Sequence, residues 1–190
     1  MGRTRRISFI VCALLLCAAT DYARAQEASL DQKQQSEALP RFGRVNERLY
    51  RGAQPRKEGF KQLAERGITT VINLRNDDER ALVEELDAKA AGLRYFNVPF
   101  KRRGPPTESQ VDQVLSLIAD EENGVVFLHC AQGQDRTGMV IALYRITRDG
   151  WTDDQAIREA EDRGMKFWHF RMKRYISEYF RNRVRAHSRK

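Results

Sequence analysis

Apolar runs alternate with amphipathic stretches along most of the chain after residue 42. Residues 68–74 are rich in β-branched side chains and residues 125–128 form a continuous apolar run, and both patterns are typical of buried strands. Shorter runs predict two further strands, over residues 49–52 and 93–100. Apolar residues at helical spacing predict helices over residues 59–66, 77–91 and 107–118, around 139–144, from 152 and from 170. Strands separated by helices predict the α/β class, with a single domain and a central, mainly parallel sheet flanked by helices.

Local signals predict where several of these helices begin. Thr107 with Gln110 and Thr152 with Gln155 have the spacing of a capping box. The helix over residues 77–91 has an acidic first turn, which suits the positive end of the helix dipole. Its apolar positions are Ala81, Leu82, Leu86 and Ala90.

Residues 1–25 have the pattern of a secretory signal peptide. Three arginines precede an apolar stretch over residues 7–19, and Ala23-Arg24-Ala25 offers a small-x-small cleavage site. The apolar stretch is shorter than the ~20 residues that a spanning helix needs. We therefore expect export to the periplasm or outside the cell, and the alternative is a membrane anchor formed by residues 7–19.

The remaining chain divides into a linker and a domain. Residues 26–41 are polar, rich in glutamine and without periodicity, so they predict a flexible linker before a domain over residues 42–187. The whole chain has 190 residues, of which 41% are hydrophobic and 32% charged. This composition permits one folded domain and excludes a multispan membrane protein.

The net charge of the chain is positive, but this charge alone does not select one class of binding partner. Removal of residues 1–25 would take away four arginines and one aspartate and lower the net charge from +8 to +5. A positive charge suits an anionic substrate, but it suits nucleic acid, a membrane surface or simple solubility equally well. Of the three cysteines, only Cys130 lies beyond residue 25.

The segment from His129 to Gly138 carries the candidate chemistry, because it lies where a predicted strand ends and a buried helix begins. Cys130 and Arg136 bracket five residues, a loop long enough to curl its N–H groups around one tetrahedral anion. A helix N-terminus favours the thiolate form of a cysteine, so Cys130 is the candidate nucleophile. Arg136 offers a planar fork for two phosphoryl oxygens.

The other loop residues have supporting roles in this prediction. Gly133 permits a positive φ and Gly138 permits close approach as the helix starts. The Thr137 hydroxyl is expected to donate to the Cys130 sulfur, and His129 is expected to orient the loop. The residues expected to hold the substrate phosphate are His129, Ala131, Gln132, Gly133, Gln134 and Gly138.

The sequence His-Cys-x-x-Gly-x-x-Arg-Thr-Gly over residues 129–138 resembles the signature of the cysteine-dependent protein tyrosine and dual-specificity phosphatases. With Arg-Leu-Tyr-Arg-Gly-x-Gln-Pro over residues 48–55, the similarity extends over about residues 43–180 and is strongest to the small, atypical dual-specificity branch of plants and fungi. The resemblance implies a single-domain fold, no metal or other cofactor, and hydrolysis through a phosphocysteine intermediate.

The sequence departs from this family at the general acid. The family places an aspartate on the loop after the third strand, whereas residues 98–106 contain no acidic residue. Asp135 is our first candidate, because Asp-Arg-Thr at this place resembles the myotubularin branch, although Asp135 could instead brace Arg136 or face solvent. Asp77 or Asp78 is the second candidate, and for these two a helix-capping role is favoured.

The same stretch carries three adjacent cations, Lys101, Arg102 and Arg103. Cations beside a phosphate pocket favour a substrate with several negative charges, such as a phosphoinositide, an inositol polyphosphate or an acidic phosphopeptide. A solvated charge run is the alternative. Trp168 and His169 could close over a substrate or belong to the core.

The sequence thus predicts a phosphatase that acts on phosphotyrosine, phosphoserine or phosphothreonine, or on inositol-type polyphosphorylated compounds. The expected partner is a phosphorylated protein or a small polyphosphorylated molecule. We expect no nucleic acid partner, and membrane contact only through an uncleaved N-terminal segment. A protein of a different class, a catalytically weak module that recognises phosphorylated partners or lipids, is the alternative, because the usual acid is missing.

Overall fold

The computed structural model describes residues 26, 37–101, 104–166 and 170–187. The chain divides into two units, Met1–Glu37 and Ala38–Lys190, and the second contains all the strands and helices discussed below. Ala38 and Leu39 are buried in this unit, so the domain begins before the predicted start at Phe42. In the part of the chain described, no helix is long and apolar enough to cross a membrane. The predicted signal peptide lies outside the described residues.

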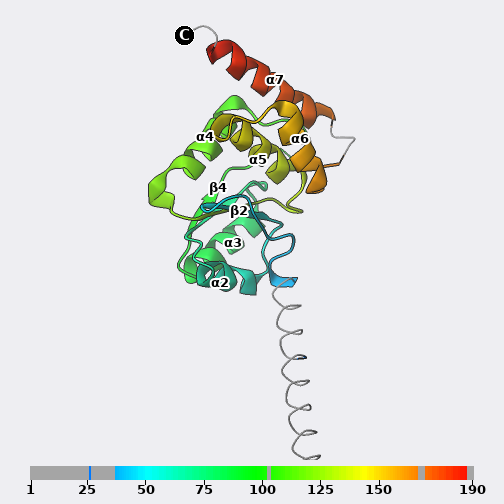
Figure 1. Ribbon diagram of the computed structural model, residues 1–190. Coiled ribbons are helices and arrows are strands. Elements are labelled where there is room, and N and C mark those ends of the chain that lie inside the picture. Colours follow the sequence, from blue (N-terminus) through cyan, green and yellow to red (C-terminus); the bar gives the residue numbers. More distant parts are fainter. Residues whose placement is uncertain (1–25, 27–36, 102–103, 167–169, 188–190) are drawn as a thin grey trace, which may run out of the picture. The chain divides into compact units, whose positions relative to one another are not determined.

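A five-stranded sheet in the order β1-β2-β5-β3-β4 forms the centre of the domain (Figure 1). The strands are β1 Gly43–Arg44, β2 Leu49–Gly52, β3 Thr70–Asn73, β4 Arg94–Asn97 and β5 Val126–His129. Only β1 pairs antiparallel with its neighbour, and the other four strands run parallel. The predicted α/β class with a mainly parallel sheet is confirmed.

Helices cover both faces of this sheet. They are α2 Lys57–Glu65, α3 Glu79–Ala90, α4 Glu108–Ala119, α5 Asp135–Arg148, α6 Asp153–Asp162 and α7 Phe170–His187, with a short 3₁₀ turn, η1, at Glu121–Asn123. Helices α2 and α3 lie on one face, and α4, α5 and α6 lie on the other, with α7 packed against α5 and α6 (Figure 1). Because β2, β3, β4 and β5 run parallel, their carboxyl ends meet at one edge, where α/β proteins place their sites.

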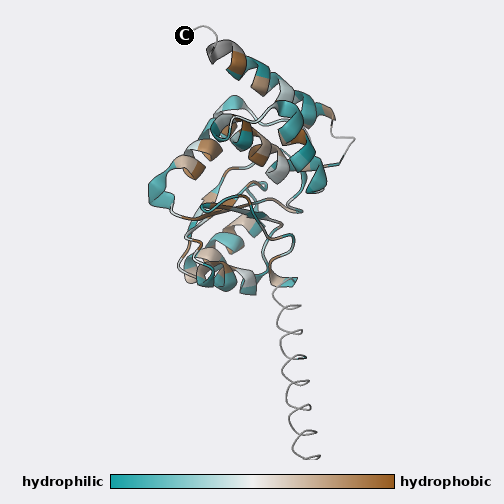
Figure 2. Ribbon diagram, viewed as in Figure 1, coloured by the Kyte–Doolittle hydropathy of each residue, from teal (hydrophilic) through white to brown (hydrophobic). Residues whose placement is uncertain are grey.

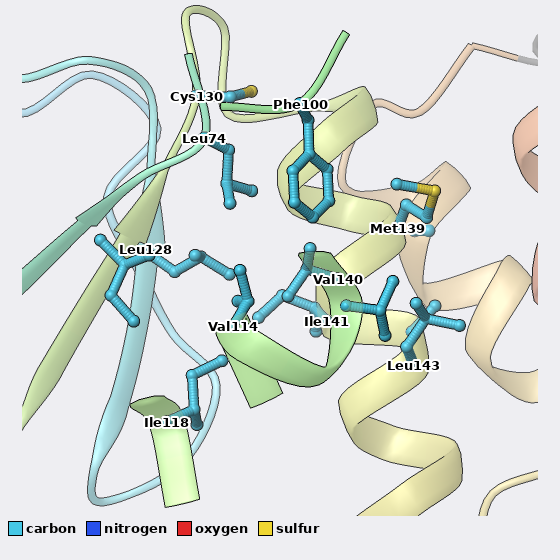
Figure 3. Packing of buried hydrophobic residues seen from close by; sticks show 14 of the residues in the cluster. Leu74, Phe100, Val114, Ile118, Leu128, Cys130, Met139, Val140, Ile141 and Leu143 are labelled. Atoms are coloured by element: carbon cyan, nitrogen blue, oxygen red, sulfur yellow. The ribbon is translucent and has the colours of Figure 1, made fainter. Parts of the chain in front are cut away.

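The core has one cluster on each face of the sheet. The larger cluster packs α4, α5 and α7 against β3 and β5, and Leu128, Val114 and Ile141 lie in it (Figure 3). The smaller cluster packs α2 and α3 around Phe60, Leu63 and Phe127. Figure 2 shows the apolar strands between helices that carry polar residues on their outer surfaces. All four residues of β5 are buried, as the continuous apolar run predicts.

The predicted capping boxes are both present. Thr107 and Thr152 each accept a hydrogen bond from the backbone three residues on, and Gln110 and Gln155 each accept one in return. Asp78 caps α3 by accepting from the backbone N–H groups of Arg80 and Ala81.

The larger apolar residues of α3 are not on its buried face. Leu82 and Leu86 are 59% and 68% exposed, whereas Ala81, Glu84 and Ala88 are buried. The pattern of apolar residues therefore does not decide how this helix is rotated. Glu84 turns inward because it has partners there, which belong to the site described next.

Candidate active site

A cleft of about 1100 Å³ opens at the carboxyl ends of the parallel strands and brings Cys130 and Arg136 together. Its walls come from the loops after β3, β4 and β5 and from the start of α7. The residues that line it are Arg75, Asn76, Asp78, Arg80, Gly104, Cys130, Ala131, Gln132, Asp135, Arg136, Lys166, Phe170, Arg171 and Met172. The loop predicted to hold a phosphate thus forms the floor of a large cleft.

Cys130 follows the last residue of β5, and α5 begins five residues later at Asp135. The cysteine is buried, and it lies beside Leu74 and Phe100 at the border of the larger core cluster (Figure 3). The free N–H groups and the dipole at the N-terminus of α5 favour an anion in this loop. The site therefore suits both a thiolate and a bound phosphate.

The Arg136 side chain is held by two backbone carbonyls at the wall of the cleft. Its Nη1 donates to the carbonyl oxygen of Leu74 at 3.0 Å and lies 3.5 Å from that of Phe100. These carbonyls belong to the segments that follow β3 and β4. The guanidinium is half-buried and is positioned before any substrate binds.

Gly133 has a φ of 65°, as the sequence predicts for a tight loop. A Cβ at this position would lie 2.3 Å from the carbonyl oxygen of Gly52, so a larger residue is excluded by contact as well as by conformation. Arg51 Nη2 donates to the Gly133 carbonyl oxygen at 2.7 Å. Sequence reasoning missed this contact, although Arg51 belongs to the Arg-Leu-Tyr-Arg-Gly motif.

Arg51 is only 4% exposed, and burial is the main cause that lowers its pKa. The nearby charge of Glu159 acts in the opposite direction. The loop that holds Cys130 is therefore hydrogen-bonded to an arginine side chain that is buried inside the protein.

His129 is fully buried behind the loop and does not line the cleft. Its Nε2 lies 2.6 Å from Glu84 Oε1, and its Nδ1 lies 3.4 Å from the carbonyl oxygen of Cys130. This placement fits the predicted orienting role and does not fit direct contact with a substrate. Glu84 is a second residue that sequence reasoning missed.

The three candidate acids occupy different places. Asp135 lines the cleft, and its Oδ1 accepts from the backbone N–H of Lys166 at 3.2 Å. Asp78 also lines the cleft but caps α3. Asp77 accepts from Asn97 Nδ2 and does not line the cleft.

The remaining loop residues separate into two groups. Ala131 and Gln132 are exposed and line the cleft. The side chain of Gln134 packs against Gly164, and a Cβ added to Gly164 would lie 2.5 Å from Gln134 Nε2. Gly138 packs near Ala160. These two contacts connect the loop to the end of α6 and the segment that follows it.

Thr137 Oγ1 is buried and has no hydrogen-bond partner among the described residues, so the structure does not show the expected bond to the Cys130 sulfur.

Only one residue of the predicted basic rim lies within the described part of the chain. Lys101 is exposed and does not line the cleft, while Arg102 and Arg103, like Trp168 and His169, lie outside the described residues. Among the residues that the structure describes, the cations that line the cleft are Arg75, Arg80, Arg136, Lys166 and Arg171, and they outnumber the carboxylates, Asp78 and Asp135. They come from segments far apart in the sequence, so no local charge run predicts them.

The known proteins that are similar to this chain include several phosphatases. A family model described as a DSP-PTPase phosphatase fused to NAD+ kinase matches residues 20–178. The dual specificity protein phosphatase TpbA of Pseudomonas aeruginosa is 31% identical over 121 residues, which are 64% of this chain and 53% of that protein. Inositol diphosphatase DSP5 of Arabidopsis thaliana is 26% identical over 144 residues, 74% of this chain and 70% of that protein. The chain thus spans about half the length of the TpbA protein.

Solved structures share the fold. The crystal structure of P. aeruginosa TpbA has a TM-score of 0.59 with 28% identity and covers 75% of this chain and 84% of its own. The catalytic domain of the PP-IP phosphatase SIW14 from S. cerevisiae, in complex with citrate, has a TM-score of 0.66 with 20% identity and covers 78% of this chain and 90% of its own. Because the family model extends over most of the chain and over the whole cysteine loop, the chain belongs to the DSP-PTPase family, within the atypical dual-specificity phosphatases.

Proposed function

We propose that this chain is a phosphatase that hydrolyses phosphate monoesters through a phosphocysteine intermediate. The observation that carries the proposal is that Cys130 and Arg136 line one cleft, on a loop that ends at the N-terminus of α5. A nucleophile, a bidentate cation and a set of N–H donors around one anion site are what phosphoryl transfer needs.

The reaction follows from these positions. The Cys130 thiolate attacks phosphorus, an S–P bond forms, and the bond between phosphorus and the ester oxygen breaks. The leaving oxygen takes a proton from a nearby acid. Water then attacks phosphorus and gives up a proton to that same group, the S–P bond breaks, and inorganic phosphate and the thiolate are released. Arg136 and the loop N–H groups hold the phosphoryl oxygens in both steps.

For the acid we propose Asp135, which lines the cleft beside Arg136. The hydrogen bond from the Lys166 backbone holds its carboxylate in one orientation. Asp78 also reaches the cleft, but its carboxylate already satisfies the first turn of α3. This contrast favours Asp135 over Asp78.

For the substrate we propose a molecule with more than one phosphate, such as an inositol polyphosphate. Among the described residues, four cations in addition to Arg136 line the cleft, so its positive charge exceeds what a single phosphate on the Cys130 loop would balance. The names of two similar proteins, inositol diphosphatase DSP5 and the PP-IP phosphatase SIW14, support this substrate class, and the name of TpbA supports phosphoproteins.

The test is release of inorganic phosphate from an aryl phosphate and from an inositol polyphosphate, by the wild-type chain and by Cys130→Ser. We expect turnover of both by the wild type and none by the variant, which should still bind phosphate esters. Binding without turnover by the wild type would instead indicate a phosphate-recognition module.

We also propose that residues 1–25 direct export, on the sequence pattern alone. Expression of the full chain in a Gram-negative host should give a mature protein that begins at Gln26 outside the cytoplasm. N-terminal sequencing of the fractionated protein measures this. An intact N-terminus in the membrane fraction would favour the anchor formed by residues 7–19.

A further inference from the structure

Helix α7 has one side on which two cations lie between two exposed apolar residues. Phe170 is 70% exposed and Val184 is 47% exposed, although both are large and apolar. Arg174 and Arg181 lie between them and are also exposed. Intervals of four, seven and three residues place these four side chains on one side of a helix, because 3.6 residues complete a turn. We call these four residues the outer face of α7.

The opposite side of α7 holds this outer face toward solvent. Met172 and Ile176 are buried in the larger core cluster. Tyr179 packs against the same cluster, and its hydroxyl oxygen lies 3.0 Å from Thr147 Oγ1 on α5. Helix α7 lies at the edge of the domain (Figure 1). The outer face therefore cannot turn inward unless α7 loses its contacts with the core.

The charge of this helix is strongly positive. The sequence of α7 contains six arginines and lysines and one acid, Glu178. Glu178 Oε1 lies 3.6 Å from Arg174 Nε, but the two side chains are 52% and 72% exposed, so water screens this pair and it contributes little. Arg171 adds a further exposed cation beside the cleft. The helix therefore attracts a surface that carries many negative charges.

An apolar crevice opens beside the C-terminal half of α7. It has a volume of about 500 Å³ and lies between α7 and the end of α5. Trp151, Phe180 and Val184 line it, together with Arg148 and Arg183. Apolar side chains and cations around one opening suit a molecule that has both an apolar chain and an anionic group.

The apolar residues distinguish between the possible anionic partners. A nucleic acid or another hydrophilic polyanion would pair with Arg174 and Arg181 and leave Phe170 and Val184 in water. The interface of a bilayer accepts both kinds of side chain, because headgroup phosphates pair with cations and apolar side chains enter the boundary of the acyl chains. Phe170 and Val184 are separated by about 21 Å along the helix, so both can reach one flat surface.

We propose that the outer face of α7 binds the surface of a bilayer that contains anionic lipids. Arg174 and Arg181 pair with headgroup phosphates, and Phe170 and Val184 lie among the lipids. Phe170 also lines the cleft, so this contact brings the opening of the cleft to the membrane surface. The contact is separate from the one expected of residues 7–19, and it does not depend on the proposed function.

The first experiment measures the binding of the full chain to vesicles of phosphatidylcholine, alone or mixed with phosphatidylglycerol. The double variant Arg174→Gln, Arg181→Gln should bind the anionic vesicles about 25-fold more weakly, because each cation near such a surface contributes about fivefold. The control is Lys57→Gln, Lys61→Gln on α2. It removes the same charge from side chains that are 78% and 82% exposed, on the other face of the sheet. Equal losses in the two double variants would overturn the proposal.

The second experiment tests the apolar part of the outer face. Val184→Ser leaves the charge unchanged and should weaken binding to the anionic vesicles about fivefold, because part of a valine side chain is no longer removed from water. An unchanged affinity would mean that α7 binds by charge alone. That result would overturn the proposal of a bilayer in favour of a soluble polyanion.

The third experiment needs no variant. Amide hydrogen exchange of the full chain should slow over residues 170–184 when anionic vesicles are added, and not when phosphatidylcholine vesicles are added. Unchanged exchange in α7 would overturn the proposal, even if residues 7–19 hold the chain on the vesicles.

Measurements of activity separate this inference from the proposed function. Arg174 and Arg181 do not line the cleft, so their double variant should hydrolyse a soluble aryl phosphate at the rate of the wild type. A chain that binds anionic vesicles through α7 and releases no phosphate would refute the proposed function and leave this inference intact.

Discussion

Arg51 Nη2 donates a hydrogen bond of 2.7 Å to the carbonyl oxygen of Gly133. The two residues are 82 positions apart in the sequence, and both are buried. With its carbonyl directed at Arg51, Gly133 leaves the cleft side of the loop to N–H groups. A buried arginine thus gives the phosphate loop its shape from behind.

Arg51→Met should therefore lower kcat/KM by about tenfold to hundredfold, because a loop displaced by a fraction of an ångström holds the phosphoryl group poorly. Loss of the donor to a buried carbonyl should also lower the free energy of unfolding by about 1–3 kcal/mol. Steady-state kinetics and urea unfolding measure the two effects. Arg48→Met is a matched control, because Arg48 also donates to backbone carbonyls, at Asp120 and Gly124, away from the cleft. An unchanged kcat/KM in Arg51→Met would refute the supporting role.

Gly133→Ala should abolish turnover, because the new Cβ would lie 2.3 Å from the Gly52 carbonyl oxygen. Gly92→Ala provides the control, since Gly92 also has a positive φ, of 79°, but has no atom within 4 Å of a built Cβ. The control should lose only about 1 kcal/mol of stability and no activity. Similar activities of the two variants would show that the contact with Gly52 is unimportant.

If Asp135 protonates the leaving oxygen, Asp135→Asn should lower kcat on an inositol phosphate by roughly 10²–10⁴. An activated aryl phosphate should be affected much less, because its leaving group departs as an anion without help. Asp78→Asn is the comparison: it should weaken the cap of α3 without a dependence on the leaving group. Equal losses of Asp135→Asn on both substrates would mean that Asp135 only shapes the loop around Arg136.

Arg171→Gln should raise KM for an inositol polyphosphate about fivefold and leave KM for an aryl phosphate unchanged, because one partly screened charge contributes about 1 kcal/mol. Arg171 lines the cleft at the start of α7. Arg174→Gln, on the same helix, is the control, because Arg174 is 72% exposed and does not line the cleft. A similar KM change for both substrates would contradict a role in holding a second phosphate.

The stability of the domain should fall above about pH 10, where an unfolded tyrosine ionises. Burial and the charge of Glu84 raise the pKa of Tyr95, so the folded chain keeps this proton while the unfolded chain releases it. The contribution is complete below pH 10 and is lost as the pH rises. Urea unfolding between pH 8 and 11 should show that the free energy of unfolding falls less steeply with pH in Tyr95→Phe than in the wild type. Burial also raises the pKa of Tyr175, which should account for part of the decline that is left in this variant. An unchanged slope in Tyr95→Phe would contradict this account.

The sequence predicts the parts of this protein that depend on neighbours along the chain. The capping boxes at Thr107 and Thr152 and the glycine of the loop are local features, and the structure has them where the sequence predicts. The buried face of α3 does not follow from its apolar positions, because it carries Glu84, which pairs with His129, 45 positions later. Periodicity weighs only apolar residues and has no way to detect such a partner.

The cations of the cleft were missed for a related reason. Arg75, Lys166 and Arg171 stand in different segments, and only the meeting of strand ends with the start of α7 places them around one opening. The run at residues 101–103 was conspicuous in the sequence, yet the one member that the structure describes, Lys101, is outside the cleft lining.

The hydrogen bond between Lys166 and Asp135, together with the packing of Gly164 on Gln134, has a consequence for the biosynthesis of the protein. All five strands of the described sheet precede residue 130, so the sheet can form while about the last third of the chain is still being made. The cysteine loop acquires its outer support only when Gly164 and Lys166 arrive. The nascent chain therefore has a folded sheet before it has a finished cleft, and maturation of the site is tied to the last helix to emerge.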